Sequence, residues 1–375
     1  MGLRRRAAVV LAGMLLAMAG TACTREASAP SVAGPLTTTS GKDDRASLNG
    51  AGATFPAILY QAWFYDYNHQ VAKNVRINYQ AIGSGGGIQQ FIEGSVDFGA
   101  TDAPMSAKDL AKKPSTQHLP TVLGAVVLAY NIPGVSEPLR LDGAVVGGIY
   151  LGTITRWDDP AIAELNPGVA LPAQALSVVQ RSDGSGTSFV FTDWLTKVNP
   201  AWAAKVGASK SPNWPAGIGG RGNEGVSQLI RQTPYAIGYA DYSYARQLGL
   251  QMALIRNKAG AFVAPTLEAV SAAAAGAVIP EDYRASITNA EGAAAYPVSS
   301  FTFLLLDRES TSCARTTVLL RMLWWAYHDE AAVAETRALD YAPLPAELLP
   351  RVEATMRSFA CKGEPLLPPV GDAVR

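Results

Sequence analysis

The sequence predicts an α/β fold with mostly parallel sheets, divided into two discontinuous domains. Strand-like segments alternate with segments of helical periodicity along most of the chain. With 375 residues, 48% of them hydrophobic and 17% charged, the chain can bury a large core and is long enough for two domains. No low-complexity block or internal repeat separates two halves after residue 46, so two domains would have to share the chain discontinuously.

The predicted strands come in a regular order: 47–49, 75–80, 96–99, 119–131, 175–180 and 299–306. The runs 119–131 and 299–306 are almost continuously apolar, which is typical of buried strands. Helices are predicted after three of the strands, one of them with Pro56 in its first turn, and a fourth apolar helix covers 316–327.

The first 46 residues are not expected to belong to the fold. Arg4 to Arg6 precede an uninterrupted apolar and glycine run, 7–20, which is too short to cross a bilayer as a helix of about 20 residues and is typical of a signal peptide. The following Gly-Thr-Ala-Cys ending resembles a bacterial lipoprotein site, so residues 1–23 are predicted to be a signal peptide with Cys23 as the lipidated residue. Ordinary cleavage after Ala19 is the alternative. Residues 24–46, rich in Ser, Thr, Ala, Gly and Pro, are predicted to be a flexible linker.

Two further cysteines lie in the part that would be exported. A structural disulfide between Cys313 and Cys361 is expected there, with a metal or redox pair as the alternative. Three cysteines lack zinc-site spacing, and no metal site is predicted.

Three glycine-rich turns carry hydroxyl side chains where a helix is predicted to begin: Gly52-Ala53-Thr54-Phe55, Gly83-Ser84-Gly85 and Gly184-Ser185-Gly186-Thr187. Helix N-termini present unpaired N–H groups and the positive end of the dipole, and glycine lets a ligand approach the backbone. Each turn alone is more often structural. Three together favour a site for a small oxyanion.

Charged residues accompany these turns. Arg181 ends a predicted strand and could bind an oxyanion bidentately, and Asp183 could orient its guanidinium. Asp102 follows the strand at 96–99, where an Asx-turn or a helix cap is the alternative explanation.

The glycine-rich turns and the segments around them resemble the phosphate-binding component of phosphate ABC transporters. The resemblance rests on GAGATFP (50–56), IGSGGG (82–87), DFGATDAP (97–104) and RSDGSGTSFVFT (181–192), and extends through YLGTITRWDDPAI (150–162), GIGGRGNEGV (217–226), AIGYADYSYA (236–245) and LDYAPLP (339–345). It implies a two-lobed periplasmic-binding-protein fold of the type II kind. Hinge strands near Tyr130 and Ser300 would join lobe 1, at 47–129 and 299–375, to lobe 2, at 130–298.

The resemblance also implies a set of phosphate ligands in the cleft between the lobes: Thr54, Phe55, Ser84, Asp102, Arg181, Ser185, Gly186 and Thr187, with Asp183 orienting Arg181. Asp102 would accept a hydrogen bond from a hydroxyl of phosphate, which sulfate lacks, and would thereby exclude sulfate. The implied partners are the permease and ATPase subunits of the transporter. The expected location is the periplasm or the cell surface, with the membrane reached through the lipid anchor. No cofactor is implied.

Other function classes are weaker. Lys+Arg 31 equals Asp+Glu 31, and this zero net charge argues against a nucleic-acid binder. A phosphatase is disfavoured because none of His69, His118 and His328 lies beside a Gly-Ser turn. No phosphate-binding loop of the ATPase type is present, so ATP hydrolysis would belong to a partner. A binder of another oxyanion and a phosphate sensor or adhesin remain alternatives.

Overall fold

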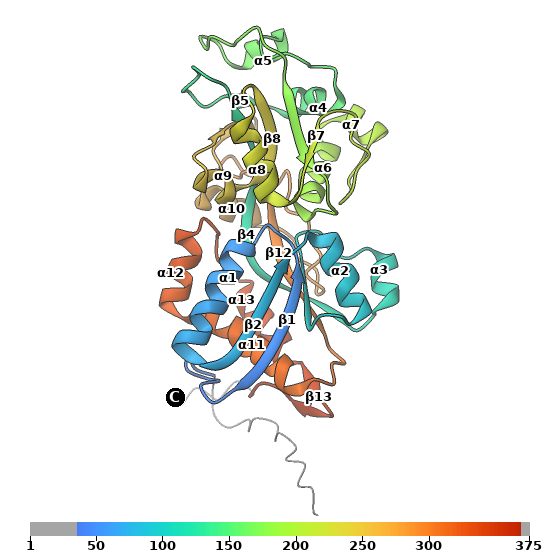
Figure 1. Cartoon of the computed structure of the whole chain (residues 1–375), viewed down its shortest axis with the longest axis vertical. Helices are drawn as coiled ribbons and strands as arrows, with labels where there is room; N and C mark the ends of the chain where they lie inside the picture. Colours follow the sequence, from blue (N-terminus) through green and yellow to red (C-terminus); the bar gives the residue numbers. More distant parts are fainter. Residues whose placement is uncertain (1–35, 369–375) are drawn as a thin grey trace, which may run out of the picture.

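The computed structural model describes residues 36–368. The predicted signal peptide, the lipidation site Cys23 and residues 24–35 of the predicted linker lie outside the described residues. Two lobes lie one above the other along the long axis of the molecule (Figure 1), which confirms the predicted two-lobed α/β fold. No helix among residues 36–368 has the length and apolarity needed to span a membrane.

Lobe 1, at the bottom of Figure 1, contains a parallel sheet in the order β2-β1-β3. Its strands are β1 (Arg45–Gly52), β2 (Asn74–Ala81), β3 (Phe98–Thr101), β12 (Ser299–Asp307), β13 (Ala360–Cys361) and β14 (Glu364–Pro365). Its helices are α1 (Ala57–Asp66) with the π-helical turn η1 (Tyr67–Val71), α2 (Ser84–Glu93), α3 (Ala107–Lys112), α11 (Cys313–His328), α12 (Glu330–Ala338) and α13 (Leu349–Arg357).

Lobe 2, at the top, contains a second parallel set in the order β8-β6-β7. Its strands are β5 (Arg140–Leu141), β6 (Ser177–Arg181), β7 (Ile218–Gly220), β8 (Ala236–Asp241), β9 (Gln251–Met252), β10 (Leu254–Arg256) and β11 (Phe262–Val263). Its helices are α4 (Gly143–Leu151), α5 (Pro160–Leu165), α6 (Gly186–Val198), α7 (Pro200–Lys205), α8 (Gly222–Gln232), α9 (Tyr242–Gln247) and α10 (Leu267–Ala274).

One long strand, β4 (Thr116–Asn131), joins the two sheets. Its first part pairs with β12 in lobe 1, and from Val126 onward it pairs with β8 in lobe 2. Fourteen consecutive residues of β4 are buried, as expected for a strand covered on both faces. The partner of β4 changes between Ala125 and Val126, while the predicted lobe boundaries at 129/130 and 298/299 stay a prediction.

The expectation of mostly parallel sheets is wrong at the centre of the molecule. Each lobe has three parallel strands, but β12 is antiparallel to both β3 and β4, and β4 is antiparallel to β8. The chain leaves lobe 1 along β4 and returns along β12 after building lobe 2, so these two neighbouring strands run in opposite directions.

The folded part begins earlier than residue 47. β1 starts at Arg45, and the buried Asp44 accepts a hydrogen bond from Nη1 of Arg321 on α11 at 2.6 Å. The C-terminal end of the predicted linker therefore packs on lobe 1. The contact is favourable because a buried carboxylate requires a paired cation.

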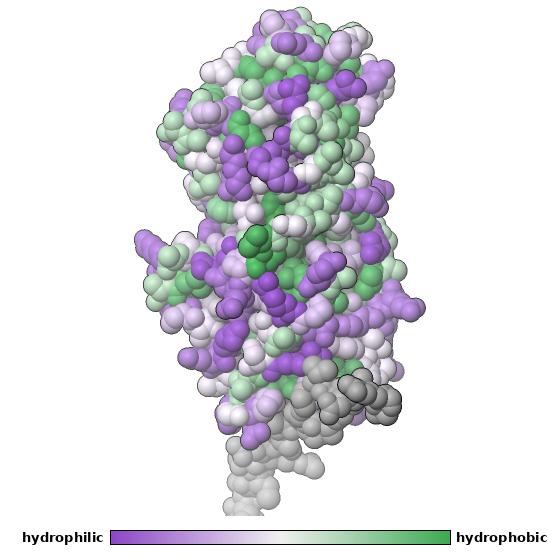
Figure 2. Space-filling view, turned by 180° about the vertical axis from the view of Figure 1, so that it is seen from behind, coloured by the Kyte–Doolittle hydropathy of each residue, from purple (hydrophilic) through white to green (hydrophobic). Residues whose placement is uncertain are grey.

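The structure joins Cys313, the first residue of α11, to Cys361 in β13, with their Cα atoms 5.5 Å apart. The disulfide ties the C-terminal hairpin to α11. Figure 2 shows the molecule from behind, where hydrophilic and hydrophobic residues are mixed over both lobes and a group of hydrophobic residues lies near the middle, where the lobes meet.

Candidate functional site

In lobe 1, three strand ends place the predicted residues at the edge that faces lobe 2. Thr54 and Phe55 follow β1, Ser84 begins α2 after β2, and Asp102 follows β3. Because β1, β2 and β3 are parallel, their carboxyl ends lie together. Ser84 Oγ accepts a hydrogen bond from the Asp102 N–H at 3.2 Å, which joins two of these turns.

In lobe 2, Arg181 is the last residue of β6 and is only 2% exposed. Its Nε and Nη2 donate to the two carboxylate oxygens of Asp183 at 2.8 and 2.5 Å, and Nη1 donates to Oγ1 of Thr187 at 3.2 Å. Burial raises the pKa of Asp183, but the hydrogen bonds and charge of Arg181 outweigh it, so the net pKa lies below its usual value. The guanidinium is thus held in one orientation by an ionised carboxylate.

Helix α6 begins beside this pair. Ser185 is its N-cap and accepts the N–H of Ser188 at 3.0 Å, while Gly186 and Thr187 form the first turn. All three are buried, with no exposed surface on Ser185 or Thr187. The N-terminus of a 13-residue helix therefore faces lobe 1 next to a guanidinium, which makes this corner electropositive.

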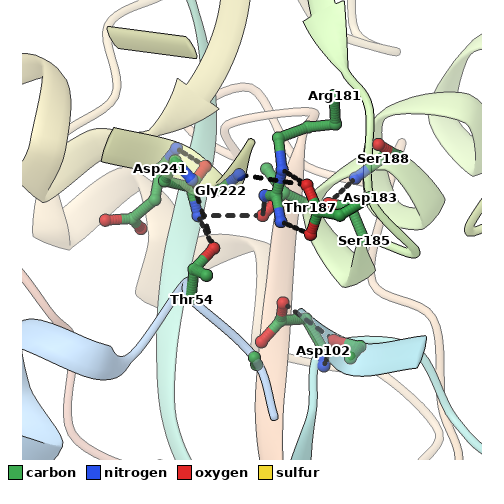
Figure 3. A network of polar contacts seen from close by, with 12 residues as sticks. Thr54, Asp102, Arg181, Asp183, Ser185, Thr187, Ser188, Gly222 and Asp241 are labelled. Carbon is green, nitrogen blue, oxygen red and sulfur yellow. Dashed lines mark hydrogen bonds and ion pairs between the residues drawn. The ribbon is translucent and has the colours of Figure 1, made fainter. Parts of the chain in front are cut away.

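The two lobes meet at these groups (Figure 3). The N–H of Gly85 donates to the carbonyl of Gly184 across the interface at 2.7 Å. A Cβ on Gly186 would lie 2.3 Å from Ser84 Oγ and 2.4 Å from Asp102 Oδ2, so lobe 2 is pressed against the two lobe 1 side chains. The molecule is therefore in a closed arrangement.

Asp102 is the carboxyl group that lobe 1 contributes. Thr302 on β12 donates a hydrogen bond to Oδ1 of Asp102 at 2.7 Å, and Asp102 is only 2% exposed. Burial raises the pKa of Asp102 to about 7, although the hydrogen bond from Thr302, the charge of Arg181 and the hydrogen bond from Ser84 act against it. This carboxyl can therefore hold or share a proton near neutral pH.

The raised pKa of Asp102 predicts how the stability of the closed protein depends on pH when no oxyanion is present. Between 3.8 and about 7 the folded protein holds more protons at Asp102 than the unfolded chain, so the free energy of unfolding falls as pH rises through this window. Asp102→Asn should flatten the fall, as measured by urea denaturation at intervals across that window. An unchanged slope in the variant would contradict the assignment. The pKa of Asp241 is also raised by burial, so Asp241 lowers the free energy of unfolding with rising pH in the same way, and part of the slope should remain in the variant.

Each of the predicted phosphate ligands, and Asp183, lies in or beside this interface. Phe55 differs from the others because its ring packs in the core against Gly124 and its carbonyl accepts from the Tyr341 hydroxyl at 2.6 Å. Its backbone N–H is therefore the only group that could serve the predicted site. Their roles as ligands stay predictions at this point.

Sequence reasoning missed Asn223, the second residue of α8. It is fully buried, and its Nδ2 donates to Oγ1 of Thr54 in lobe 1 at 2.9 Å and to Oγ1 of Thr187 in lobe 2 at 3.1 Å. Its neighbour Gly222 donates its N–H to Asp183 at 3.0 Å. The motif GIGGRGNEGV contained both residues, but an asparagine inside a helix carries no signal of its own.

A second buried carboxyl, Asp241 at the end of β8, was also missed. It accepts from the Tyr341 hydroxyl at 3.2 Å and from the Ser243 N–H at 3.1 Å, and burial raises its pKa well above the usual value. Tyr341 belongs to lobe 1, so this contact also crosses the interface. The two residues are 100 positions apart, which hides the pair from sequence reasoning.

Comparisons with known proteins agree with this architecture. The family model described as the PBP superfamily domain matches residues 37–316. The phosphate-binding protein PstS of Pasteurella multocida is 42% identical over 315 residues, covering 83% of this chain and 90% of that protein. PstS of Xylella fastidiosa is 39% identical over 311 residues, covering 82% and 84%.

Among solved structures, the periplasmic phosphate-binding protein PfluDING, bound with phosphate, aligns with a TM-score of 0.68 at 22% identity, covering 87% of this chain and 96% of that one. At this identity the structure supports the fold alone, while the sequence relatives carry the family. The chain therefore belongs to the PBP superfamily and, within it, to the family of PstS phosphate-binding proteins.

Proposed function

We propose that this protein binds inorganic phosphate outside the cytoplasmic membrane and delivers it to a phosphate ABC transporter. The ligands would be the backbone N–H groups and side chains of both lobes that meet at the interface: Thr54, Phe55, Ser84, Asp102, Arg181, Ser185, Gly186 and Thr187. Two relatives named phosphate-binding protein PstS, which this chain matches over most of their length, support the proposed function.

One observation favours phosphate over other oxyanions. Asp102, a buried carboxyl group, lies among hydroxyl donors, a helix N-terminus and the Arg181 guanidinium. A carboxylate repels an anion unless the anion brings a proton to share. Phosphate keeps at least one proton near neutral pH and sulfate keeps none, so a site with one acceptor fits phosphate.

Calorimetric titration tests the proposal. Protein stripped of bound anions by unfolding and refolding would be titrated with phosphate, arsenate and sulfate. We expect tight 1:1 binding of phosphate, binding of arsenate because it has the same shape and protonation, and no binding of sulfate. A stripped, folded sample that binds no phosphate would refute the function.

The selectivity rests on Asp102 and can be tested separately. At pH 8, where Asp102 is mostly ionised and only accepts hydrogen bonds, Asp102→Asn introduces a donor. We expect sulfate affinity to rise by about tenfold or more, which is the contribution of one hydrogen bond to a charged group. Phosphate affinity should fall, because the shared proton loses its anionic acceptor. Asp158→Asn, which removes an exposed carboxylate in lobe 2, is the control for charge alone and should leave both affinities unchanged. Equal rejection of sulfate by Asp102→Asn and the parent would contradict this account.

Delivery would follow from closure. Because both lobes contribute ligands, phosphate itself would stabilise the closed form, and the closed surface would be recognised by the permease. The hinge would lie where the chain crosses between the lobes at β4 and β12, near Tyr130 and Ser300 as predicted. Lipidation of Cys23, followed by the linker, would tether the protein to the membrane. Loss of phosphate uptake on deletion of the gene would separate a transport role from a sensor or adhesin.

A phosphate site that contains serines also suggests an enzymatic function as a second candidate. Ser84 and Ser185 both lie in the interface, but their side chains bond to Asp102 and to the Ser188 N–H. Among the described residues, no histidine serves as a base for either serine. We therefore propose binding without catalysis. Purified protein should release no phosphate from a chromogenic phosphate ester.

A further inference from the structure

Asn223 occupies a central position between the two lobes. Its Nδ2 lies 2.9 Å from Oγ1 of Thr54 in lobe 1 and 3.1 Å from Oγ1 of Thr187 in lobe 2. An amide NH₂ group has two hydrogens, and here each serves one threonine. One side chain therefore links a hydroxyl of each lobe.

The orientation of this amide follows from a third contact. Asn223 Oδ1 accepts the backbone N–H of Asp241 at 3.1 Å, and an N–H can only be satisfied by the carbonyl oxygen of the amide. The NH₂ group must then point toward the two threonines. Asn223 is the second residue of α8 and is fully buried.

Hydrogen-bond counting shows what this does to the threonines. A hydroxyl accepts two hydrogen bonds and donates one. Thr54 Oγ1 accepts from Asn223 Nδ2 and from the Asn223 N–H, which is 3.2 Å away. Thr187 Oγ1 accepts from Asn223 Nδ2 and from Arg181 Nη1. Both oxygens have filled their accepting capacity, so each hydroxyl proton must be donated elsewhere.

We infer that Asn223 is a positioning residue that makes Thr54 and Thr187 obligate donors toward the ligand, one from each lobe. The inference rests on the proposed binding of phosphate in this interface. Two hydroxyls that can only donate require two ligand oxygens that accept, and unprotonated oxygens are the better acceptors. Asn223 would thus increase the number of hydroxyl donors directed at an oxyanion, although it acts through the two threonines and not on the ligand.

The experiment compares Asn223→Ala with the parent by calorimetric titration of inorganic phosphate at about pH 5 and about pH 8, below and above its second ionisation. We expect phosphate affinity to fall by about tenfold or more at pH 8, because both hydroxyls become free to turn away. The loss should be smaller at pH 5, because a freed hydroxyl can accept from the extra proton of the monoanion. This change in the pH profile distinguishes positioning from a merely structural role.

Asn166→Ala is the matched control. Asn166 is also a buried asparagine of lobe 2, 4% exposed, and its Nδ2 donates to the carbonyls of Arg140 and Ile162. It lies beside α5, at the far end of the lobe from the site (Figure 1). The variant should lose stability but keep the phosphate affinity and pH profile of the parent. Asn223→Ser, which retains a polar group that cannot reach both threonines, is the second variant in case Asn223→Ala does not fold.

The outcomes are separable. A parent that binds phosphate, together with a folded Asn223 variant of equal affinity and equal pH profile, overturns the inference and leaves the proposed function intact. A loss of affinity that is the same at both pH values assigns Asn223 a structural role and also overturns it. A parent that binds no phosphate overturns the proposed function, and the inference with it.

Discussion

Gly186→Ala should weaken phosphate binding by about a hundredfold, although the substitution adds one methyl group and removes no hydrogen bond. The added Cβ would lie 2.3 Å from Ser84 Oγ and 2.4 Å from Asp102 Oδ2, distances at which atoms overlap. Ser84 and Asp102 are buried and belong to the opposite lobe, so neither can move aside without losing its own hydrogen bonds. The lobes would stop short of full closure, and overpacking of this size costs about 1–3 kcal/mol in the closed state alone.

Calorimetry would measure the affinity, and small-angle scattering with saturating phosphate would measure closure through the radius of gyration. Gly225→Ala is the matched control, because Gly225 also lies in the first turns of a lobe 2 helix but its Cβ would meet nothing closer than 3.6 Å. That variant should bind as the parent does and unfold at the same or a slightly higher temperature. Parent-like affinity and compaction in Gly186→Ala would show that the lobes do not close as tightly as the structure has them.

The contrast between these two glycines shows what sequence reasoning could supply. The three glycine-rich turns were correctly placed at helix starts, because glycine, a hydroxyl and an apolar helical period are all local signals. The reason for Gly186 is not local. It lies in contact with Ser84 and Asp102, which are far away along the chain, and nothing in a Gly-Thr dipeptide distinguishes contact with another lobe from an ordinary helix start.

The errors of the sequence-based prediction have the same origin. β4 begins at Thr116, three residues before the predicted start, because Gln117 and His118 are polar and yet buried in the strand. The antiparallel direction of β12 depends on the whole of lobe 2 lying between it and β4. Asp44 packs on lobe 1 through Arg321, 277 positions away. In each case a partner distant in the sequence overrides the local pattern.

Asn223 and Asp241 show why the site itself was only partly predictable. The predicted residues are those that would touch an oxyanion, and their types reveal it: hydroxyls, glycines, an arginine and a carboxylate. Asn223 and Asp241 contact other protein groups, and Asn223 is proposed to act through them. Residues that orient a ligand-binding group carry no composition or spacing that differs from ordinary buried polar residues.

Arg181→Ala should have the largest effect, lowering phosphate affinity by about a thousandfold and also destabilising the protein. Arg181 is the guanidinium at the site, and its side chain is 1% exposed. Hydrogen bonds to a charged ligand contribute about 1.5–3 kcal/mol each, and the variant loses the guanidinium together with its charge. It also leaves Asp183 without its cation. Breaking one side of a buried ion pair costs about 3–5 kcal/mol, and somewhat less here because Asp183 is 13% exposed and keeps the Gly222 N–H.

The chain contains its own control for this experiment. Arg156 and Asp158 have the same spacing as Arg181 and Asp183 and the same bidentate contact, with Nε donating to Oδ1 at 2.9 Å, but their side chains are 52% and 37% exposed. Arg156→Ala should change neither phosphate affinity nor the midpoint of urea denaturation beyond the small effect of a surface pair. The double variant Arg181→Ala with Asp183→Ala separates the two losses. It should recover part of the stability, because the unpaired carboxylate is gone. It should recover only the small part of the affinity that this carboxylate had cost by repelling the anion, because the guanidinium is still absent. Recovery of the parent's affinity in the double variant would mean that Arg181 serves the fold and that the anion is held by the hydroxyls and the helix N-terminus alone.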